Sequence, residues 1–250
     1  MSEYYKANRE ADWNYGGKNW KLSRSRIDLF LECPRCFYID NKFGVKRVPG
    51  FPFTLNSAVD FLLKQEFDIS RVKGQKHPLQ AKYGIEAIPY KTELMDEWRD
   101  SLRGGLKYLH DKTNFLITGG IDDVWVNPQG ELIVVDYKAT SNKEDVTELN
   151  KPYQEGYKKQ MEVYQWLLRQ NGYKVSSTGY FVYCNGKTDR EAFDGKLDFD
   201  VTLIVYVGDD SWIEKTLIDI KKCLDSDIIP ESGKSCDHCA YFNAREKFEK

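Results

Sequence analysis

Two apolar segments near the centre of this 250-residue chain flank a tight-turn sequence, and this pair constrains the fold more than any other feature. Residues 115–126 and 132–138 are rich in β-branched and aromatic side chains, and Asn-Pro-Gln-Gly lies between them at 127–130. Such residues favour strands, and the turn sequence favours a reversal of the chain. The sequence therefore predicts a β-hairpin, with the other elements assembled around it.

The length of the connecting loop decides which side chains of the hairpin share a face. A strand has a period of two, so Asp136 and Lys138 emerge on the same side. If the loop has five residues, 127–131, Asp122 stands opposite Asp136 and valines of the two strands face each other; with four residues, Asp122 pairs with Val135 on the other face. The apolar matching favours the five-residue loop, which places two carboxylates and an ammonium group at the open end of the hairpin.

This group of charges has the composition of a hydrolytic metal site. Two close carboxylates repel each other unless a cation lies between them, and their oxygens suit Mg²⁺ or Mn²⁺. A neighbouring lysine can orient or deprotonate water, or stabilise charge on a phosphate, as phosphodiester hydrolysis requires. The alternative is a solvated strand end with a surface ion pair, and the spacing alone does not separate the two.

Helices and further strands are predicted on both sides of the hairpin. Because helices precede it, and helix, strand, strand and helix follow it, the fold class is α/β or α+β, a mixed sheet flanked by helices. From apolar periodicity and breakers, helices are expected at 23–33, 56–67, 92–106, 153–170 and 211–224, and strands at 179–184 and 199–207.

The predicted organisation is an irregular arm at residues 1–21 followed by a single domain at 22–250, because no linker divides the rest. We expect the aromatic rings of the arm to pack on the domain surface, and stacking on single-stranded bases is the alternative. These rings belong to Tyr4, Tyr5, Trp13, Tyr15 and Trp20.

The motifs of the hairpin resemble those of a known nuclease superfamily. Gly119-Gly120-Ile121-Asp122 followed by Asp136-Tyr137-Lys138 resembles the G-x-x-D and D-x-K elements of the PD-(D/E)XK nucleases. The chain is most similar to their RecB-like branch, which includes the AddB nuclease domain and CRISPR-associated RecB-like iron–sulfur exonucleases. Gln160 and Tyr164 resemble the Q-x-x-x-Y motif of that branch, and Cys33-Pro34-Arg35-Cys36-Phe37-Tyr38 resembles its opening signature, so the resemblance spans about residues 22–240.

The resemblance implies a restriction-endonuclease-like core and a metal-dependent deoxyribonuclease. It implies an exonuclease acting on DNA ends or single-stranded DNA, in recombination, repair, or phage or CRISPR DNA processing. The alternatives are a catalytically silent DNA-binding or scaffold subunit and a structure-specific endonuclease. The resemblance implies that Asp122 and Asp136 bind Mg²⁺ or Mn²⁺ with the Tyr137 carbonyl. It implies that Lys138 acts on water or phosphate, and that Gln160 and Tyr164 position the substrate.

The chain departs from the branch at one expected metal ligand. The branch carries a histidine on the helix after the opening segment, and here Asp60 occupies that position. Aspartate is a competent ligand for Mg²⁺ or Mn²⁺, so Asp60 is a candidate third carboxylate of the site. It is equally suited to capping or solvating its helix, and the silent-subunit alternative draws its support from this departure.

Four of the six cysteines form two C-x-x-C pairs, Cys33 with Cys36 and Cys236 with Cys239. Two such pairs predict a single four-thiolate site that joins the two ends of the chain. The thiolates alone permit Zn²⁺, whereas the resemblance favours a [4Fe–4S] cluster, although iron–sulfur members hold it with one early and three late cysteines. We expect Cys184 and Cys223 to be small core residues.

The net charge of −2 conceals charges of opposite sign in different parts of the chain. Residues 1–50 carry ten Lys/Arg and six Asp/Glu, and residues 196–250 carry eight and twelve. Such an asymmetry predicts a DNA path, although a solvated surface explains each residue equally well. The candidate DNA contacts are Arg24, Arg26, Arg35, Lys46, Arg47, Lys158 and Lys159.

The sequence gives no indication of secretion or membrane insertion. The first nine residues contain no apolar core of a signal peptide, and no apolar run approaches 18 residues. We therefore expect a cytoplasmic protein, or one in the host cytoplasm if it is phage-encoded. Reduced cysteines are consistent with such a compartment.

Overall fold

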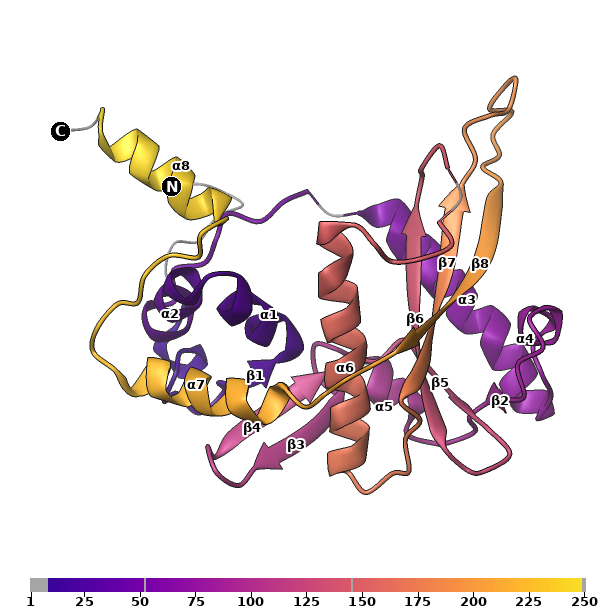
Figure 1. The fold of residues 1–250 in the computed structure, drawn as a ribbon, viewed down its shortest axis with the longest axis horizontal. Coiled ribbons are helices and arrows are strands. Elements are labelled where there is room, and N and C mark those ends of the chain that lie inside the picture. Colours follow the sequence, from indigo (N-terminus) through magenta and orange to yellow (C-terminus); the bar gives the residue numbers. More distant parts are fainter. Residues whose placement is uncertain (1–8, 52, 145, 249–250) are drawn as a thin grey trace. The chain divides into compact units, whose positions relative to one another are not determined.

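The computed structural model describes residues 9–51, 53–144 and 146–248, which form two compact units (Figure 1). The first unit takes the residues up to Phe51, Leu109–Thr118, and those from Ser211 onward. The second takes the residues between Phe51 and Leu109, together with Gly119–Asp210. The prediction of an arm at 1–21 and a single domain at 22–250 stays a prediction.

The second unit is built on a five-stranded mixed sheet. Its strands are antiparallel neighbours except for one parallel pair, β6 and β7. A mixed sheet flanked by helices is the predicted architecture, and it is confirmed. In spatial order the strands are β2 (Ile88–Pro89), β5 (Asp123–Val126), β6 (Leu132–Thr140), β7 (Thr178–Gly186) and β8 (Phe199–Val207).

The hairpin between β5 and β6 has the register expected from its apolar residues. Val124 pairs with Val134 and Val126 with Leu132, which leaves a loop of five residues, 127–131. The pairing, extended by one position beyond β5, sets Asp122 opposite Asp136. The five-residue alternative of the sequence analysis is therefore confirmed.

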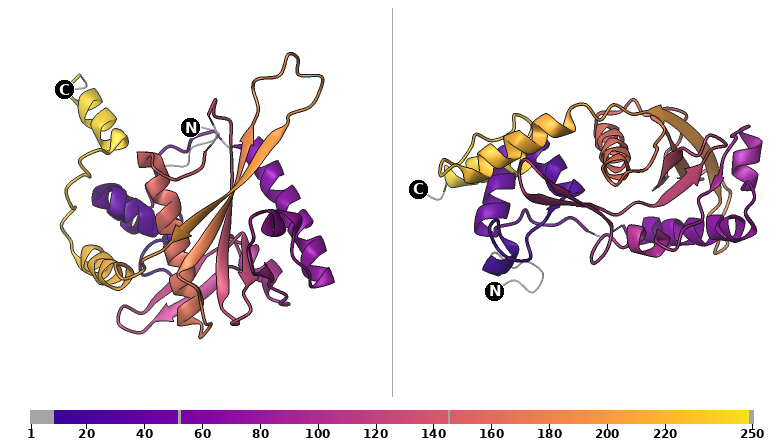
Figure 2. Two further views of the ribbon diagram at one scale, coloured as in Figure 1. Left: turned by 45° about the vertical axis from the view of Figure 1, so that its right-hand side comes forward. Right: turned by 90° about the horizontal axis from the view of Figure 1, so that it is seen from below.

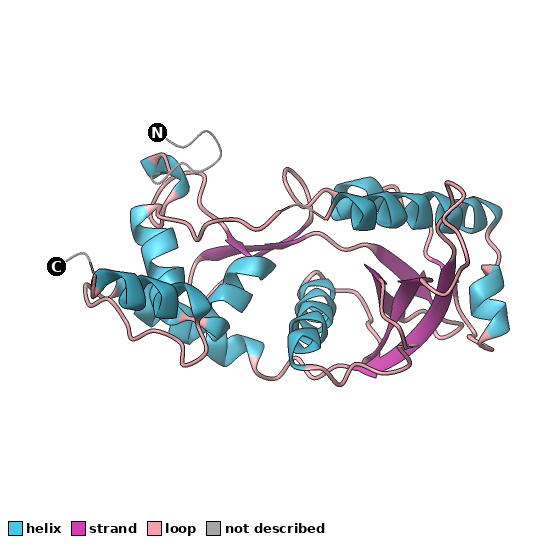
Figure 3. Cartoon of the chain, turned by 90° about the horizontal axis from the view of Figure 1, so that it is seen from above, coloured by secondary structure: helices cyan, strands magenta, loops and turns pink. Residues whose placement is uncertain are grey.

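Helices α3 (Thr54–Lys73) and α6 (Glu155–Gln170) cover opposite faces of this sheet (Figure 3). Leu63 and Phe67 of α3 share one hydrophobic cluster with strand residues that include Trp125 and Tyr137. On the other face α6 lies close to the sheet, since a Cβ added at Gly179 of β7 would lie 2.5 Å from the sulfur atom of Met161.

The first unit is mainly helical. Helix α1 is followed closely by α2, and Pro34 occupies the first turn of α2, where a missing N–H is tolerated. Strand β1 pairs in parallel with β4 in a three-stranded sheet of order β1-β4-β3. Its elements are β1 (Leu22–Ser23), α1 (Arg24–Glu32), α2 (Pro34–Phe43), β3 (Leu106–His110, which begins in the second unit), β4 (Phe115–Gly119), α7 (Ile213–Asp225) and α8 (Asp237–Glu246).

Short elements complete both units. Helix α5 contacts the start of β5, since its Arg99 donates to the carbonyl of Asp122, and α4 follows α3, which appears in purple in both views of Figure 2. These elements are η1 (Ala11–Trp13), α4 (Pro78–Lys82), α5 (Met95–Arg99) and η2 (Pro152–Gln154). None of the helices in the described ranges combines the length and apolar character needed to cross a membrane.

Two predicted elements are wrong in their extent. The strand expected over 115–126 is two strands, β4 and β5, which belong to different sheets. The helix expected over 92–106 is confined to Met95–Arg99, because the chain turns at Gly104 and Gly105 and then enters β3. Both errors arise where a glycine pair interrupts an apolar pattern.

The described part of the predicted arm packs against the first unit. The ring of Trp20 lies edge-on to Phe115 at a centroid distance of 5.2 Å, and Tyr15 lies edge-on to both rings. These contacts agree with the packing expected for Tyr15 and Trp20, whereas Trp13 is 45% exposed. Tyr4 and Tyr5 lie outside the described residues.

Candidate active site and metal centre

Asp136 lies in the middle of β6 with no solvent exposure. Its Oδ2 forms an ion pair with Lys138, two residues along the same strand, whereas Oδ1 has no hydrogen-bond partner among the described residues. Burial raises the pKa of Asp136 to about 7; Lys138 opposes this rise and the charge of Asp122 adds to it. A buried carboxylate with vacant lone pairs is costly unless a cation or another donor approaches it.

Asp122 lies directly before β5 and is fixed from the neighbouring strand. Its Oδ2 accepts a hydrogen bond from the backbone N–H of Tyr137 at 3.0 Å. The two glycines before it allow a close approach of other elements: a Cβ at Gly119 would lie 2.8 Å from the ring of Tyr164, and one at Gly120 would lie 2.5 Å from Ser101. The G-x-x-D spacing therefore has a steric basis here.

Lys138 connects the carboxylates to helix α6. Its Nζ lies 3.4 Å from Oε1 of Gln160, and Nε2 of Gln160 donates to the hydroxyl of Tyr164 at 3.1 Å. The ammonium also lies 4.7 Å from the ring centre of Tyr157, within the range of a cation–π contact. Because Gln160 and Tyr164 are four residues apart, both lie on the same face of α6.

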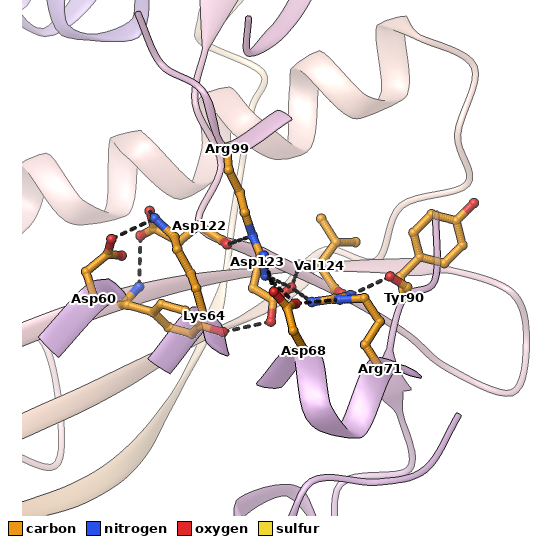
Figure 4. A network of polar contacts seen from close by, with 10 residues as sticks. Asp60, Lys64, Asp68, Arg71, Tyr90, Arg99, Asp122, Asp123 and Val124 are labelled. Atoms are coloured by element: carbon orange, nitrogen blue, oxygen red, sulfur yellow. Dashed lines mark hydrogen bonds and ion pairs between the residues drawn. The ribbon is translucent and has the colours of Figure 1, made fainter. Parts of the chain in front are cut away.

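Asp60 of α3 is the third carboxylate of the cluster, and Lys64 links it to Asp122 (Figure 4). The Nζ of Lys64 lies 2.7 Å from Oδ2 of Asp60 and 3.4 Å from Oδ1 of Asp122. Burial, and then the charge of Asp122, raise the pKa of Asp60. Burial lowers the pKa of Lys64, but Asp122 and Asp60 outweigh it and raise that pKa above its ordinary value.

The structure thus brings together Asp60, Asp122, Asp136, Lys138, Gln160 and Tyr164, all within the second unit. Sequence reasoning missed Lys64, although its position one helical turn after Asp60 would have indicated it. The sequence analysis proposed the Tyr137 carbonyl as a metal ligand, and that assignment stays a prediction. The described contacts of Tyr137 instead involve its backbone N–H and its hydroxyl.

A second ionic network, also missed, lies behind the carboxylates (Figure 4). Asp123 is fully buried, forms an ion pair with Arg71, and accepts a hydrogen bond from the hydroxyl of Tyr137 at 2.7 Å. Arg99 donates to the backbone carbonyl of Asp122 at 3.0 Å and pairs with Asp68 at 2.7 Å. The network fixes the backbone carbonyl of Asp122 and the side chain of the next residue, Asp123.

The four cysteines of the C-x-x-C pairs converge in the first unit. Their sulfur atoms all lie within 4.8 Å of one another, and three of the separations are 3.5–3.7 Å. Four thiolates at this spacing match a tetrahedral Zn²⁺ at about 2.3 Å from each sulfur. A [4Fe–4S] cluster binds each cysteine to a different iron and therefore holds the sulfurs farther apart.

The surroundings act unequally on these thiols: burial raises the pKa of Cys36 and, with the neighbouring thiols, that of Cys239, whereas Cys33 is shifted the other way. The backbone N–H of Gly233 donates to Cys33 at 3.2 Å, and the guanidinium of Arg47 donates to Cys236 at 3.2 Å. Burial raises the pKa of Cys33, but hydrogen bonds from the backbone of Cys36 and Gly233 outweigh it and lower that pKa to about 6. Thiolates are the form that binds a metal.

The remaining two cysteines lie apart from this cluster. Cys184 is buried in β7, and Cys223 is half-buried on α7. Their positions agree with the expectation that they are small core residues.

Most of the candidate DNA contacts already have acidic or backbone partners. Arg24 pairs with Asp28, Arg35 with Glu231, and Lys158 with Glu155. Arg26 donates to the carbonyl of Lys21 and stacks over Trp20, and Arg47 pairs with Glu32. A role of these side chains, of Lys46 and of Lys159 in binding DNA stays a prediction.

Comparison with known proteins identifies the class. The model of the PD-(D/E)XK nuclease superfamily matches residues 21–244, so the chain belongs to this superfamily. Membership implies metal-dependent hydrolysis of phosphodiester bonds and a nucleic-acid substrate, and it confirms the expected fold class and superfamily.

A solved structure titled "Crystal structure of SSO0001" is 17% identical, with 84% of this chain and 79% of that chain covered and a TM-score of 0.34. No curated protein matches the chain.

Proposed function

We propose that the chain is a Mg²⁺- or Mn²⁺-dependent deoxyribonuclease whose metal is held by Asp60, Asp122 and Asp136. The observation that carries this proposal is Asp136, which is fully buried, pairs with Lys138 through Oδ2, and keeps Oδ1 without a hydrogen-bond partner among the described residues. An all-oxygen donor set with an orphaned buried carboxylate fits a small hard cation.

The roles of the other site residues follow from their contacts. A bound Mg²⁺ or Mn²⁺ would polarise a phosphate oxygen and lower the pKa of a water molecule. Lys138, held by Gln160 and the ring of Tyr157, is placed to orient the attacking water or to stabilise negative charge on the phosphate. Gln160 and Tyr164 present an amide and a hydroxyl suited to positioning the substrate.

The RecB-like resemblance supports an exonuclease that acts on DNA ends or single strands. A silent scaffold of the same fold is the rival, because Asp60 replaces the expected histidine. The geometry favours the enzyme, since the Asp60 side chain joins the cluster of Asp122 instead of capping its helix. Reduced thiols and a DNA substrate also support a location in the cytoplasm, or in the host cytoplasm for a phage protein.

Cleavage of labelled linear and circular DNA with Mn²⁺ tests this function. Asp136→Asn and Lys138→Met should each lower the cleavage rate about 10²–10⁴-fold, because each removes a group acting in the reaction. Asp60→Ala should abolish activity while Asp60→His, which restores the ligand type of the branch, should retain it. Closed circles should remain intact if ends are required.

Matched controls make the result decisive. Lys215→Met removes an exposed lysine of α7 that pairs with Asp219, and it should leave cleavage unchanged. If the parent, Asp136→Asn and Lys138→Met cleave equally, the catalytic assignment of these residues is wrong. If none of the three cleaves although circular dichroism shows intact folds, the silent scaffold replaces the enzyme. Cleavage of circles would assign an endonuclease.

We propose further that the four-cysteine site binds one structural Zn²⁺ in preference to the [4Fe–4S] cluster that the resemblance favours. The support is the separation of the sulfur atoms, 3.5–3.7 Å for three pairs. Elemental analysis of protein purified without oxygen should find about one zinc per chain and no iron. Absorption near 400 nm together with iron and sulfide would establish the cluster instead.

A further inference from the structure

We propose that Lys64 is an internal counter-cation that competes with the divalent metal for Asp60 and Asp122. This inference rests on the proposed function and adds a residue to it. Lys64 would lower the affinity of the site for metal, while it keeps the carboxylates together when no metal is bound.

The position of Lys64 between the two carboxylates is the first observation. Asp60 and Lys64 are one turn apart on α3, and the ammonium reaches from there to Asp122 beside β5. The lysine side chain is 20% exposed, so water screens these contacts only partly. Lys64 is thus the link between the α3 carboxylate and the hairpin carboxylate (Figure 4).

The oxygens that Lys64 contacts are the ones a metal would need. Oδ2 of Asp122 already accepts the N–H of Tyr137, and Lys64 lies at the other oxygen, Oδ1. The ammonium also takes Oδ2 of Asp60 at the shorter distance of 2.7 Å. A cation that binds Asp60 and Asp122 together must therefore replace Lys64 or share these oxygens with it.

The second lysine of the site has a separate set of partners. Lys138 pairs with Asp136 and lies against Gln160 and Tyr157. Each lysine thus neutralises a different part of the cluster. If Lys64 is removed, Lys138 can take its place only by giving up the contacts that Lys138 makes with Asp136, Gln160 and Tyr157.

The charges of the cluster predict opposite effects of Lys64 on its two states. With every group ionised, three carboxylates and two ammonium groups leave one negative charge, and without Lys64 they leave two. The more negative site attracts a divalent cation more strongly, but its carboxylates repel each other more when no cation is bound. If Lys64 had a purely structural role, its removal would lower the stability of the protein without changing the affinity of the site for metal.

Calorimetric titration with Mn²⁺ alone separates these possibilities. In buffer freed of trace metal by a chelating resin, Lys64→Met should bind Mn²⁺ about tenfold more tightly than the parent, an effect of the size of one lost competing charge at a partly buried site. The same variant should melt at a lower temperature without Mn²⁺ and gain more from its addition.

The controls use the same substitution elsewhere and a second substitution at the site. Lys215→Met breaks another i,i+4 lysine–aspartate pair and should change neither quantity. Lys64→Gln keeps a polar side chain and serves if Lys64→Met does not fold. Affinity for Mn²⁺ that is unchanged or weaker in the folded Lys64 variant would overturn the inference.

This test is independent of the proposed nuclease activity. If the parent binds no Mn²⁺, or if Asp136→Asn and Asp122→Asn bind it as the parent does, the proposed metal site itself is wrong. If the parent binds Mn²⁺ through these aspartates and Lys64→Met binds it no more tightly, only the role of Lys64 fails.

Discussion

The protonation of Asp136 links the candidate site to the stability of the chain. Burial raises the pKa of this carboxyl to about 7, far above that of an aspartate in an unfolded chain. The folded protein therefore keeps the proton to a higher pH than the unfolded chain does. The protonated Asp136 carboxyl therefore contributes its full stabilisation below the pKa of the unfolded aspartate, and this stabilisation is lost as the pH rises through about 7.

We expect the metal-free protein to show this loss directly. The urea concentration at the midpoint of unfolding should decrease as the pH rises from about 5 to about 8. Asp136→Asn should remove the part of this decrease that comes from Asp136, because the amide has no proton to lose. Unfolding curves of parent and variant across this range measure the difference. Asp189→Asn, at an exposed position, is the control, and parallel pH profiles for parent and Asp136→Asn would contradict the expectation.

Several residues of the site could be predicted because strand parity is simple. The apolar match between the two strands was sufficient to set Asp122 opposite Asp136 and to place Lys138 on the same face. The i,i+4 pair of Lys64 with Asp60 was readable from the sequence, but the contacts of Lys64 with Asp122 and of Asp123 with Arg71 were not, since these partners come from elements distant in sequence. Which charge of α3 meets which carboxylate depends on how the helix crosses the sheet, and the sequence pattern does not fix that crossing.

At the scale of elements, a buried ionic network joins α3, α5 and the hairpin. Arg71 of α3 and the hydroxyl of Tyr137 both bind Asp123, while Arg99 of α5 holds the carbonyl of Asp122. A buried charge that loses its partner is strongly destabilising, whereas a lost neutral hydrogen bond costs less. The charged residues of the network should therefore contribute more to the stability of the protein than the hydroxyl of Tyr137 does.

We expect Asp123→Ala to destabilise the protein by about 3–5 kcal/mol and Tyr137→Phe by about 1–2 kcal/mol. Because Tyr137→Phe retains the backbone N–H that binds Asp122, it should retain DNA cleavage. Chemical unfolding combined with the cleavage assay provides both measurements. Glu86→Ala, which breaks an exposed pair with Lys76, should have little effect; equal costs for the two network variants would contradict the ranking.

The elements that sequence periodicity predicted incorrectly are those shaped by contacts with other elements. The apolar run at 115–126 divides at Gly119 and Gly120, where Tyr164 and Ser101 approach too closely for any side chain. Helix α6, in contrast, follows its apolar periodicity from Glu155 to Gln170, close to the expected 153–170. Apolar periodicity is sufficient to predict a helix that lies on one face of a sheet. It is insufficient where another element packs directly on the backbone of a strand, as at Gly119 and Gly120.

At the scale of the whole molecule, the cysteine site attaches the start of the last helix, because Cys239 lies in its first turn and Cys236 directly precedes it. Cys33 precedes α2 and Cys236 precedes α8, so the site joins the starts of two helices. None of the described residues of α8 is buried, and the helix has little apolar contact to hold it. Its order should depend on the bound metal.

We expect removal of that metal to release α8 selectively. With a zinc chelator, or in Cys239→Ser, hydrogen exchange should accelerate over residues 231–248, while the strands of the second unit keep their protection. Exchange followed by mass spectrometry resolves these segments. Cys223→Ser is the control, since that thiol lies outside the site, and continued protection of α8 after zinc loss would refute its dependence on the metal.

The interleaved segments of the two units have a consequence for synthesis on the ribosome. The second unit, with all the candidate catalytic residues, is complete once Asp210 has emerged. The first unit starts earlier but must wait for the residues after Ser211, including Cys236 and Cys239. The second unit can thus be complete during translation while Cys33 and Cys36 remain without their partner thiols, so the metal proposed for the cysteine site would bind only after Cys236 and Cys239 have emerged.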